Sequence, residues 1–156
     1  MEIKTKDPQK VIKGKKSRTQ GADFEKRVRA DLEARGWVVS KWQNNVEFNR
    51  DNPKNGMNGV IEYARCVPCK NLFIGKNKPI MLTGGFPDFI AFTETIECGY
   101  MIIFVECKTN NILSKKEKEK AQWYLKNNYC SEFHLAYKTK EKNRVKVNYR
   151  RIEVGI

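Results

Sequence analysis

Two carboxylates and an amine stand beside two hydrophobic runs in the middle of the sequence. Asp88 precedes the first run, and Glu106 and Lys108 end the second. Both runs are rich in β-forming residues, and the polar segment from Thr93 to Gly99 between them suits a turn. The spacing therefore predicts an antiparallel hairpin centred near position 97, in which positions 88 and 106 are opposed. Because side chains alternate along a strand, Glu106 and Lys108 share one face.

These residue types fit a metal site. Carboxylate oxygens suit hard cations such as Mg²⁺ or Mn²⁺, which proteins often hold by one or two carboxylates plus substrate phosphates. Such a cation polarises a phosphoryl oxygen and activates bound water, and a neighbouring ammonium can stabilise the charge that develops. The alternative is that Asp88 caps a turn while Glu106 and Lys108 form a solvated pair. We favour the metal site because all three residues are in register behind two hydrophobic strands.

The order of these residues resembles a known signature. Pro87-Asp88 followed by Glu106-Cys107-Lys108 resembles the motif of the PD-(D/E)XK nuclease superfamily, which includes restriction enzymes, archaeal Holliday-junction resolvases and VRR-NUC repair nucleases. The segment from Gly21 to Glu25 is similar to the start of the resolvases, and Gln122-Trp123 is similar to the VRR-NUC pattern. The resemblance covers roughly residues 17 to 137, apart from a long intervening segment.

The resemblance implies a restriction-endonuclease-like α/β core and a Mg²⁺-dependent (or Mn²⁺-dependent) endodeoxyribonuclease. It implies structure-specific cleavage of Holliday junctions, branched or flap DNA in repair and recombination, by a homodimer. The implied catalytic residues are Asp88, Glu106, Lys108, Glu25 and Gln122, and the implied metal ligands are Asp88, Glu106, Glu25 and the backbone carbonyl of Cys107. Spacing alone also allows Glu25 to be a solvated first-turn residue and Gln122 a helix-surface residue. A non-catalytic nucleic-acid-binding protein that retains the fold is the alternative function.

Composition bounds the class of protein. A chain of 156 residues is long enough for one domain with a proper core. Its net charge of +13 and pI near 9.6 indicate a polyanionic partner, and nucleic acid is the obvious one. The sequence shows no run of 18 apolar residues and no hydrophobic N-terminal stretch, so we expect neither a membrane partner nor secretion.

The five scattered cysteines predict reduced thiols in the cytoplasm. Cys66 and Cys69 have the spacing of half a zinc site, but a tetrahedral site needs four ligands. We therefore favour two ordinary thiols over zinc.

The N-terminal residues 1–20 are rich in lysine and poor in apolar residues, which predicts a flexible basic arm ahead of a nuclease domain at 21–156. Within the arm, we expect the cluster of Lys13, Lys15, Lys16 and Arg18 to bind DNA phosphates. An ordinary frayed terminus is the alternative.

The remaining pattern predicts a helix, a mixed sheet led by the antiparallel hairpin, a second helix and closing strands. The first helix is expected at Ala22–Ala34, with every fourth residue from Phe24 to Leu32 buried, and a strand at Trp37–Trp42. An insertion spans about 43–84 and could contain a small hairpin of residues 59–64 and 72–74. A capping box at Ser114 starts the second helix, which runs to about Asn127. The closing strands are expected at 133–137 and 145–149.

Overall fold

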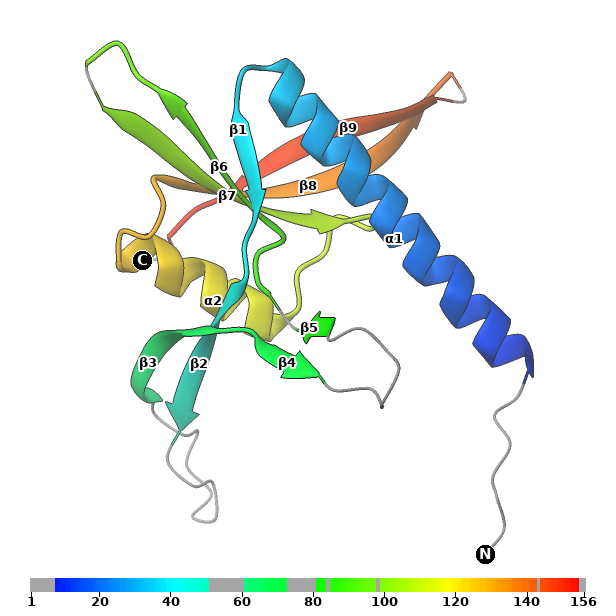
Figure 1. Ribbon diagram of the computed structural model, residues 1–156, viewed down its shortest axis with the longest axis horizontal. Helices are drawn as coiled ribbons and strands as arrows, with labels where there is room; N and C mark the ends of the chain where they lie inside the picture. Colours follow the sequence, from blue (N-terminus) through cyan, green and yellow to red (C-terminus); the bar gives the residue numbers. More distant parts are fainter. Residues whose placement is uncertain are drawn as a thin grey trace, which may run out of the picture.

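A five-stranded mixed sheet forms the centre of the protein (Figure 1). The computed structural model describes residues 8–50, 61–72, 81–83, 85–97, 99–142 and 144–154. The strand order is β1-β6-β7-β8-β9; β7 and β8 are parallel and the other neighbours are antiparallel. The strands are β1 Val38–Lys41, β6 Phe89–Glu94, β7 Tyr100–Lys108, β8 Glu132–Glu141 and β9 Arg144–Ile152. The predicted α/β class and mixed sheet are confirmed, whereas the finer prediction of a restriction-endonuclease-like core stays a prediction.

Two helices cover opposite faces of this sheet. They are α1, Pro8–Ala34, and α2, Lys115–Lys126. Ile103 and Val105 of β7 pack in the same cluster as the buried residues of α1, whereas Phe104 packs with Ala121 and Tyr124 of α2. Because successive strand residues point to opposite faces, this alternation places one helix on each side of β7. The strand is buried on both faces, as expected of one in the middle of a sheet.

Helix α1 is longer than expected. It begins at Pro8 instead of Ala22, so residues 8–20, expected to be a flexible arm, form its N-terminal half. Proline suits the first turn of a helix, and the long lysine, arginine and glutamine side chains are good helix formers. This half extends away from the sheet in Figure 1, and none of its described side chains is buried. Intrinsic propensity therefore makes a helix where no burial requires one.

No helix in the described part of the chain is long and apolar enough to cross a membrane. Helix α1 has the length, but its composition is strongly basic.

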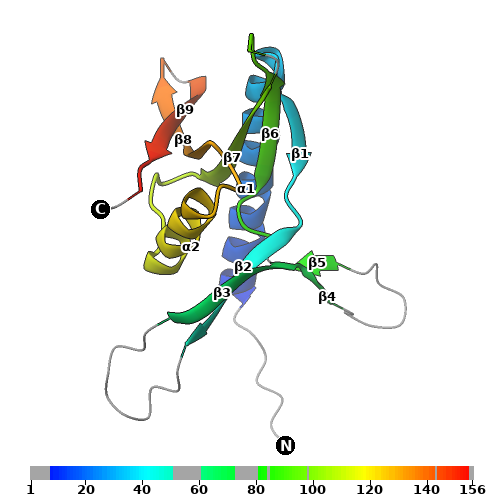
Figure 2. The same cartoon turned by 90° about the vertical axis from the view of Figure 1, so that its left-hand side faces the viewer.

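The segment between β1 and β6 forms two small ribbons. Strands β2 (Asn44–Arg50) and β3 (Ile61–Pro68) pair, as do β4 (Lys70–Leu72) and β5 (Met81–Thr83). The predicted pairing of residues 59–64 with 72–74 is wrong for the described residues, because 61–68 pair with 44–50; residues 59, 60, 73 and 74 lie outside them. The reason is packing: Val46 is buried and Phe48 half-buried in the α2 cluster. Figure 2 shows the ribbon of β2 and β3 below α2.

The second helix follows the predicted capping chemistry. The Ser114 hydroxyl accepts a hydrogen bond from the Glu117 N–H, and the Glu117 carboxylate accepts one from the Ser114 N–H. Ala121 and Tyr124 are fully buried on its inner face. The strands expected at 133–137 and 145–149 are present and extend further, as β8 and β9.

Gly85, just before β6, tests how tightly the chain packs there. A Cβ at this position would lie 2.5 Å from the Trp42 carbonyl oxygen, which is backbone and cannot rotate away. We expect Gly85→Ala to lower the free energy of unfolding by about 1–3 kcal/mol, measured by denaturant titration. Gly21→Ala is the matched control, since a Cβ there meets nothing within 4 Å and alanine favours a helix by about 0.5–1 kcal/mol. Equal effects of the two substitutions would contradict this close approach.

Candidate active site

The antiparallel register of β6 and β7 brings Asp88 and Glu106 together. Phe89 pairs with Val105 and Ile90 with Phe104, so continuing the register by one pair sets Asp88 opposite Glu106. The predicted hairpin and its centre at position 97 are confirmed. Both carboxylates therefore lie at one end of the sheet, where β6 begins and β7 ends.

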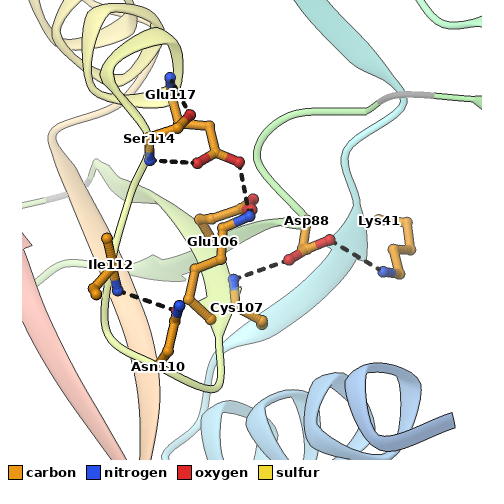
Figure 3. A network of polar contacts seen from close by, with 9 residues as sticks. Lys41, Asp88, Glu106, Cys107, Asn110, Ile112, Ser114 and Glu117 are labelled. Atoms are coloured by element: carbon orange, nitrogen blue, oxygen red, sulfur yellow. Dashed lines mark hydrogen bonds and ion pairs between the residues drawn. The ribbon is translucent and has the colours of Figure 1, made fainter. Parts of the chain in front are cut away.

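Each carboxylate is held by groups of the strand ends (Figure 3). One Asp88 oxygen accepts a hydrogen bond of 2.9 Å from the Cys107 N–H, and the other lies 3.9 Å from the Lys41 amine. Glu106 is only 6% exposed and is the buried charged side chain of the described residues. The Lys108 amine lies 3.1 Å from a Glu106 oxygen. The three residues expected to carry the chemistry thus form one cluster.

Glu25 reaches this cluster through Lys41. The Lys41 amine donates a hydrogen bond to the Glu25 carboxylate and is the same amine that lies near Asp88. The structure therefore brings Glu25 of α1 to the edge of the site. It does not do so for Gln122, which is half-buried on α2 and, among the described residues, makes no hydrogen bond to Asp88, Glu106 or Lys108.

Two further residues of the site were not expected from the sequence. The Lys108 amine donates a hydrogen bond of 2.7 Å to one oxygen of Glu117. The other Glu117 oxygen completes the capping box with Ser114 (Figure 3). Glu117 thereby fixes both the start of α2 and the position of Lys108. Lys41 is the second, and it joins Glu25 to Asp88. Lys41 and Glu117 are both charged residues, but their distance from the site in the sequence gives no sign of these contacts. Only the fold shows that Lys41 contacts Asp88 and that Glu117 contacts Lys108.

Burial and like charge shift the acids of the site. Burial and the nearby Asp88 charge raise the pKa of Glu106 to about 8, although Lys108 opposes the shift. Burial also raises the pKa of Asp88, partly offset by the Cys107 N–H. Burial disfavours the charged form of Lys108, but its hydrogen bond to Glu117 and the charge of Glu106 outweigh this and raise its pKa. An extra positive charge between the two carboxylates would relieve their mutual repulsion.

The loop that carries Asp88 is supported by the insertion. The Phe86 N–H donates to the Asn44 carbonyl of β2, and the Phe86 carbonyl accepts a hydrogen bond of 2.9 Å from the Tyr124 hydroxyl. The Trp42 N–H donates to the Asp88 carbonyl. The loop is thus bonded to β2, to α2 and to the residue after β1. A cavity of about 320 Å³ lined by Trp42, Pro87 and Asp88 opens beside it.

The cysteines that the structure describes take no part in the acid cluster through their side chains. Cys107 packs against the α1 face of the sheet, and burial raises its pKa, so it stays a neutral thiol. Cys66 and Cys69 are free, half-buried thiols. In the part of the chain that the structure describes, no three or more His, Cys, Asp or Glu side chains are gathered closely enough to hold a metal by themselves.

The residues expected to bind DNA lie on the projecting half of α1. Lys13, Lys16 and Arg18 are on this half, and Arg18 is exposed and donates a hydrogen bond to the Gly14 carbonyl. Lys15 belongs to the same helix, but its side chain lies outside the described residues. Their role with DNA stays a prediction.

Comparison with protein-family models, curated proteins and solved structures finds no match to this chain.

The raised pKa of Glu106 predicts how stability varies with pH. Because the folded state binds this proton more tightly than the unfolded state, the free energy of unfolding should fall as pH rises from about 4.5 to about 8. Glu106→Gln, a neutral mimic of the protonated acid, should remove this part of the pH dependence. The measurement is denaturant unfolding at pH values from 5 to about 8.5. Glu94→Gln, at an exposed position, is the control and should keep the wild-type slope. A Glu106→Gln profile parallel to that of the wild type would show that Glu106 is not under this strain.

Proposed function

We propose that the protein is a Mg²⁺-dependent DNA endonuclease of the PD-(D/E)XK type that hydrolyses phosphodiester bonds at the Asp88–Glu106 site. The observation that carries the proposal is the β6–β7 register, which opposes these two carboxylates and sets the Lys108 amine 3.1 Å from one of them. Neither a turn cap nor a solvated ion pair explains why a carboxylate that is 6% exposed faces a second carboxylate.

The donor set fits a divalent cation. Asp88, Glu106 and the backbone carbonyl of Cys107 would hold it, and Mg²⁺ commonly keeps water and substrate phosphates as its other ligands. The carboxylates of Glu25, Asp88, Glu106 and Glu117 outnumber the amines of Lys41 and Lys108 by two, which leaves a local negative charge when all are ionised. The cation would supply a polarised phosphoryl oxygen and a more acidic water.

The chain's own residues would orient the reaction. Glu117 holds the Lys108 amine beside Glu106, where the amine can stabilise the charge that develops on the phosphate. The Cys107 N–H fixes one oxygen of Asp88, and Lys41 lies beside the other while bonded to Glu25. Because these partners are set in the folded chain, little reorganisation is needed when the substrate binds.

The fold and charge support the same proposal. A mixed sheet in which β7 is followed by α2 and a parallel β8 is compatible with a restriction-endonuclease-like core. The net charge of +13 suits a nucleic-acid substrate. On the basis of the resemblance to the resolvases and VRR-NUC nucleases, we propose branched or flap DNA as the substrate and a homodimer as the active form.

The first test of the proposal is cleavage of plasmid and of synthetic junctions, with and without Mg²⁺ or Mn²⁺. Asp88→Asn and Glu106→Gln should each abolish cleavage while largely retaining DNA affinity, because they remove metal-binding charge but no basic contact. Glu94→Gln, at an exposed position on β6, is the control and should cut normally. Normal cleavage by either site variant in saturating Mg²⁺ would contradict the site. DNA binding by the wild type without metal-dependent cleavage of any substrate would favour the non-catalytic alternative.

Lys108 can be tested against a purely structural role. As a surface ion-pair partner, it would contribute roughly 0–1 kcal/mol to stability, and its loss would leave the rate unchanged. As an electrostatic donor to the transition state, it is worth roughly 3–4 kcal/mol, or about 10²–10³ in rate. We expect Lys108→Gln to fold and bind DNA but cut at least about a hundredfold more slowly in single-turnover assays. Lys118→Gln, which removes the same charge from the surface of α2, should cut at the wild-type rate. Near-normal cleavage by Lys108→Gln would exclude Lys108 from the mechanism.

A further inference from the structure

A basic groove lies between α1 and the end of the β8–β9 hairpin, apart from the carboxylate site. Its volume is about 850 Å³, and it is open to solvent. Arg27, Asp31 and Arg35 line it from α1, and the hairpin residues 141–142 and 144–147 line it from the other side. Five lysine and arginine side chains line it, whereas Lys41 alone lines the cavity beside Asp88.

The carboxylates of the groove are already neutralised. Asp31 lies 2.9 Å from Arg35 and accepts a hydrogen bond of 2.7 Å from the Tyr149 hydroxyl, and the Arg35 guanidinium sits over the Tyr149 ring. Glu141 lies 3.1 Å from Lys146. The charges of these pairs cancel, so they add nothing to the net charge of the groove.

Three cations of the groove remain. Arg27, Lys142 and Arg144 are exposed, and within the described residues none of them forms an ion pair. Three like charges around one groove repel one another unless an anion lies between them. Arginine guanidinium groups in particular match phosphate geometry with two parallel hydrogen bonds. The chemistry of the groove therefore selects a phosphate-bearing ligand.

The strand register relates the groove to the candidate active site. Lys108 pairs with Tyr137, and Tyr137 pairs with Asn148, the neighbour of the groove residue Val147. Two strand spacings separate β7 from β9, so the Val147 backbone lies about 10 Å from the Lys108 backbone across the sheet. Val147 packs in the α1 cluster, whereas Lys108 is bonded to Glu117 of α2, so the groove opens on the face opposite to Lys108. Beyond this point β8 and β9 continue past the end of β7 to the hairpin tip, as Figure 1 shows. The groove thus lies toward the same end of the sheet as Glu106 and Lys108, but on its α1 face.

We propose that this groove binds the sugar-phosphate backbone of the nucleic acid whose cleavage is proposed above, outside the segment held at the carboxylates. The inference rests on the proposed function for the identity of the ligand. An open groove with cations on both walls suits a continuous backbone better than a small enclosed ligand.

The test is the salt dependence of DNA binding, measured by fluorescence anisotropy of a labelled duplex in EDTA so that no cleavage occurs. Removing one phosphate-binding cation should lower the slope of log affinity against log salt by about 0.9. We expect the double variant Arg27→Gln/Arg144→Gln to lower it by about 1.8. Lys142 is left unchanged because its backbone is left-handed, with φ of 45°. Lys126→Gln is the control, since this exposed lysine ends α2, away from the groove.

The outcomes separate this inference from the proposed function. A reduced slope in the double variant, with the Lys126→Gln slope close to that of the wild type, supports the groove. An unchanged slope in the double variant, an equal reduction per charge in Lys126→Gln, or no binding by the wild type overturns it. If the wild type binds with the expected slope change but never cuts with Mg²⁺, the endonuclease proposal fails and the groove stands. Both substituted side chains of the double variant are exposed, so we expect it to fold normally. Thermal unfolding of each variant checks that a change in slope does not come from misfolding.

Discussion

The register of β6 against β7 is the constraint on which the candidate site depends. A shift of one residue would turn Glu106 and Lys108 to the α1 face and move Asp88 away from Glu106. Since β7 is apolar on both faces, polarity alone does not fix this register. It is fixed by the short turn, by the size of the packed side chains, and by two bonds of Asp88. The Cys107 N–H binds its carboxylate, and the Trp42 N–H binds its carbonyl. One residue therefore ties together β1, β6 and β7 at the point where the chemistry is proposed.

Holding Asp88 against a buried Glu106 costs stability, and the surrounding structure limits that cost. Two lysines approach the pair, but each is shared with another carboxylate: Lys41 with Glu25 and Lys108 with Glu117. The amines therefore orient the acids without cancelling their charge. Buried ion pairs often contribute no more to stability than well-packed apolar side chains. An apolar residue at position 106 would therefore be expected if stability were the only requirement. Strain kept at one place in an otherwise well-packed sheet is typical of functional sites.

The sequence predicted the elements whose signals are local. The hairpin follows from two β-rich runs around a turn, and α2 from the capping box at Ser114. The β2–β3 ribbon was missed because Asn44, Asn45, Glu47 and Asn49 interrupt its apolar pattern, and its strand order depends on packing against α2. The same limit applies within the site. Asp88, Glu106 and Lys108 are recognisable from their order, whereas the contacts of Lys41 with Glu25 and of Lys108 with Glu117 depend on how α1, β1, β7 and α2 meet.

The surfaces that would attract nucleic acid and the site that would cleave it carry opposite charges. The chain carries a net +13, but its candidate active site is locally acidic, so a phosphate backbone drawn to the protein would be repelled where it should react. Attraction must then come from basic surfaces outside the acid cluster, such as the projecting half of α1 and the groove beside β9. The groove opens on the α1 face of the sheet, whereas Glu106 and Lys108 lie on the α2 face, so the sheet separates the groove's cations from these two residues. Binding and reaction would therefore depend on different residues, and a divalent cation at the carboxylates would be what makes the two compatible.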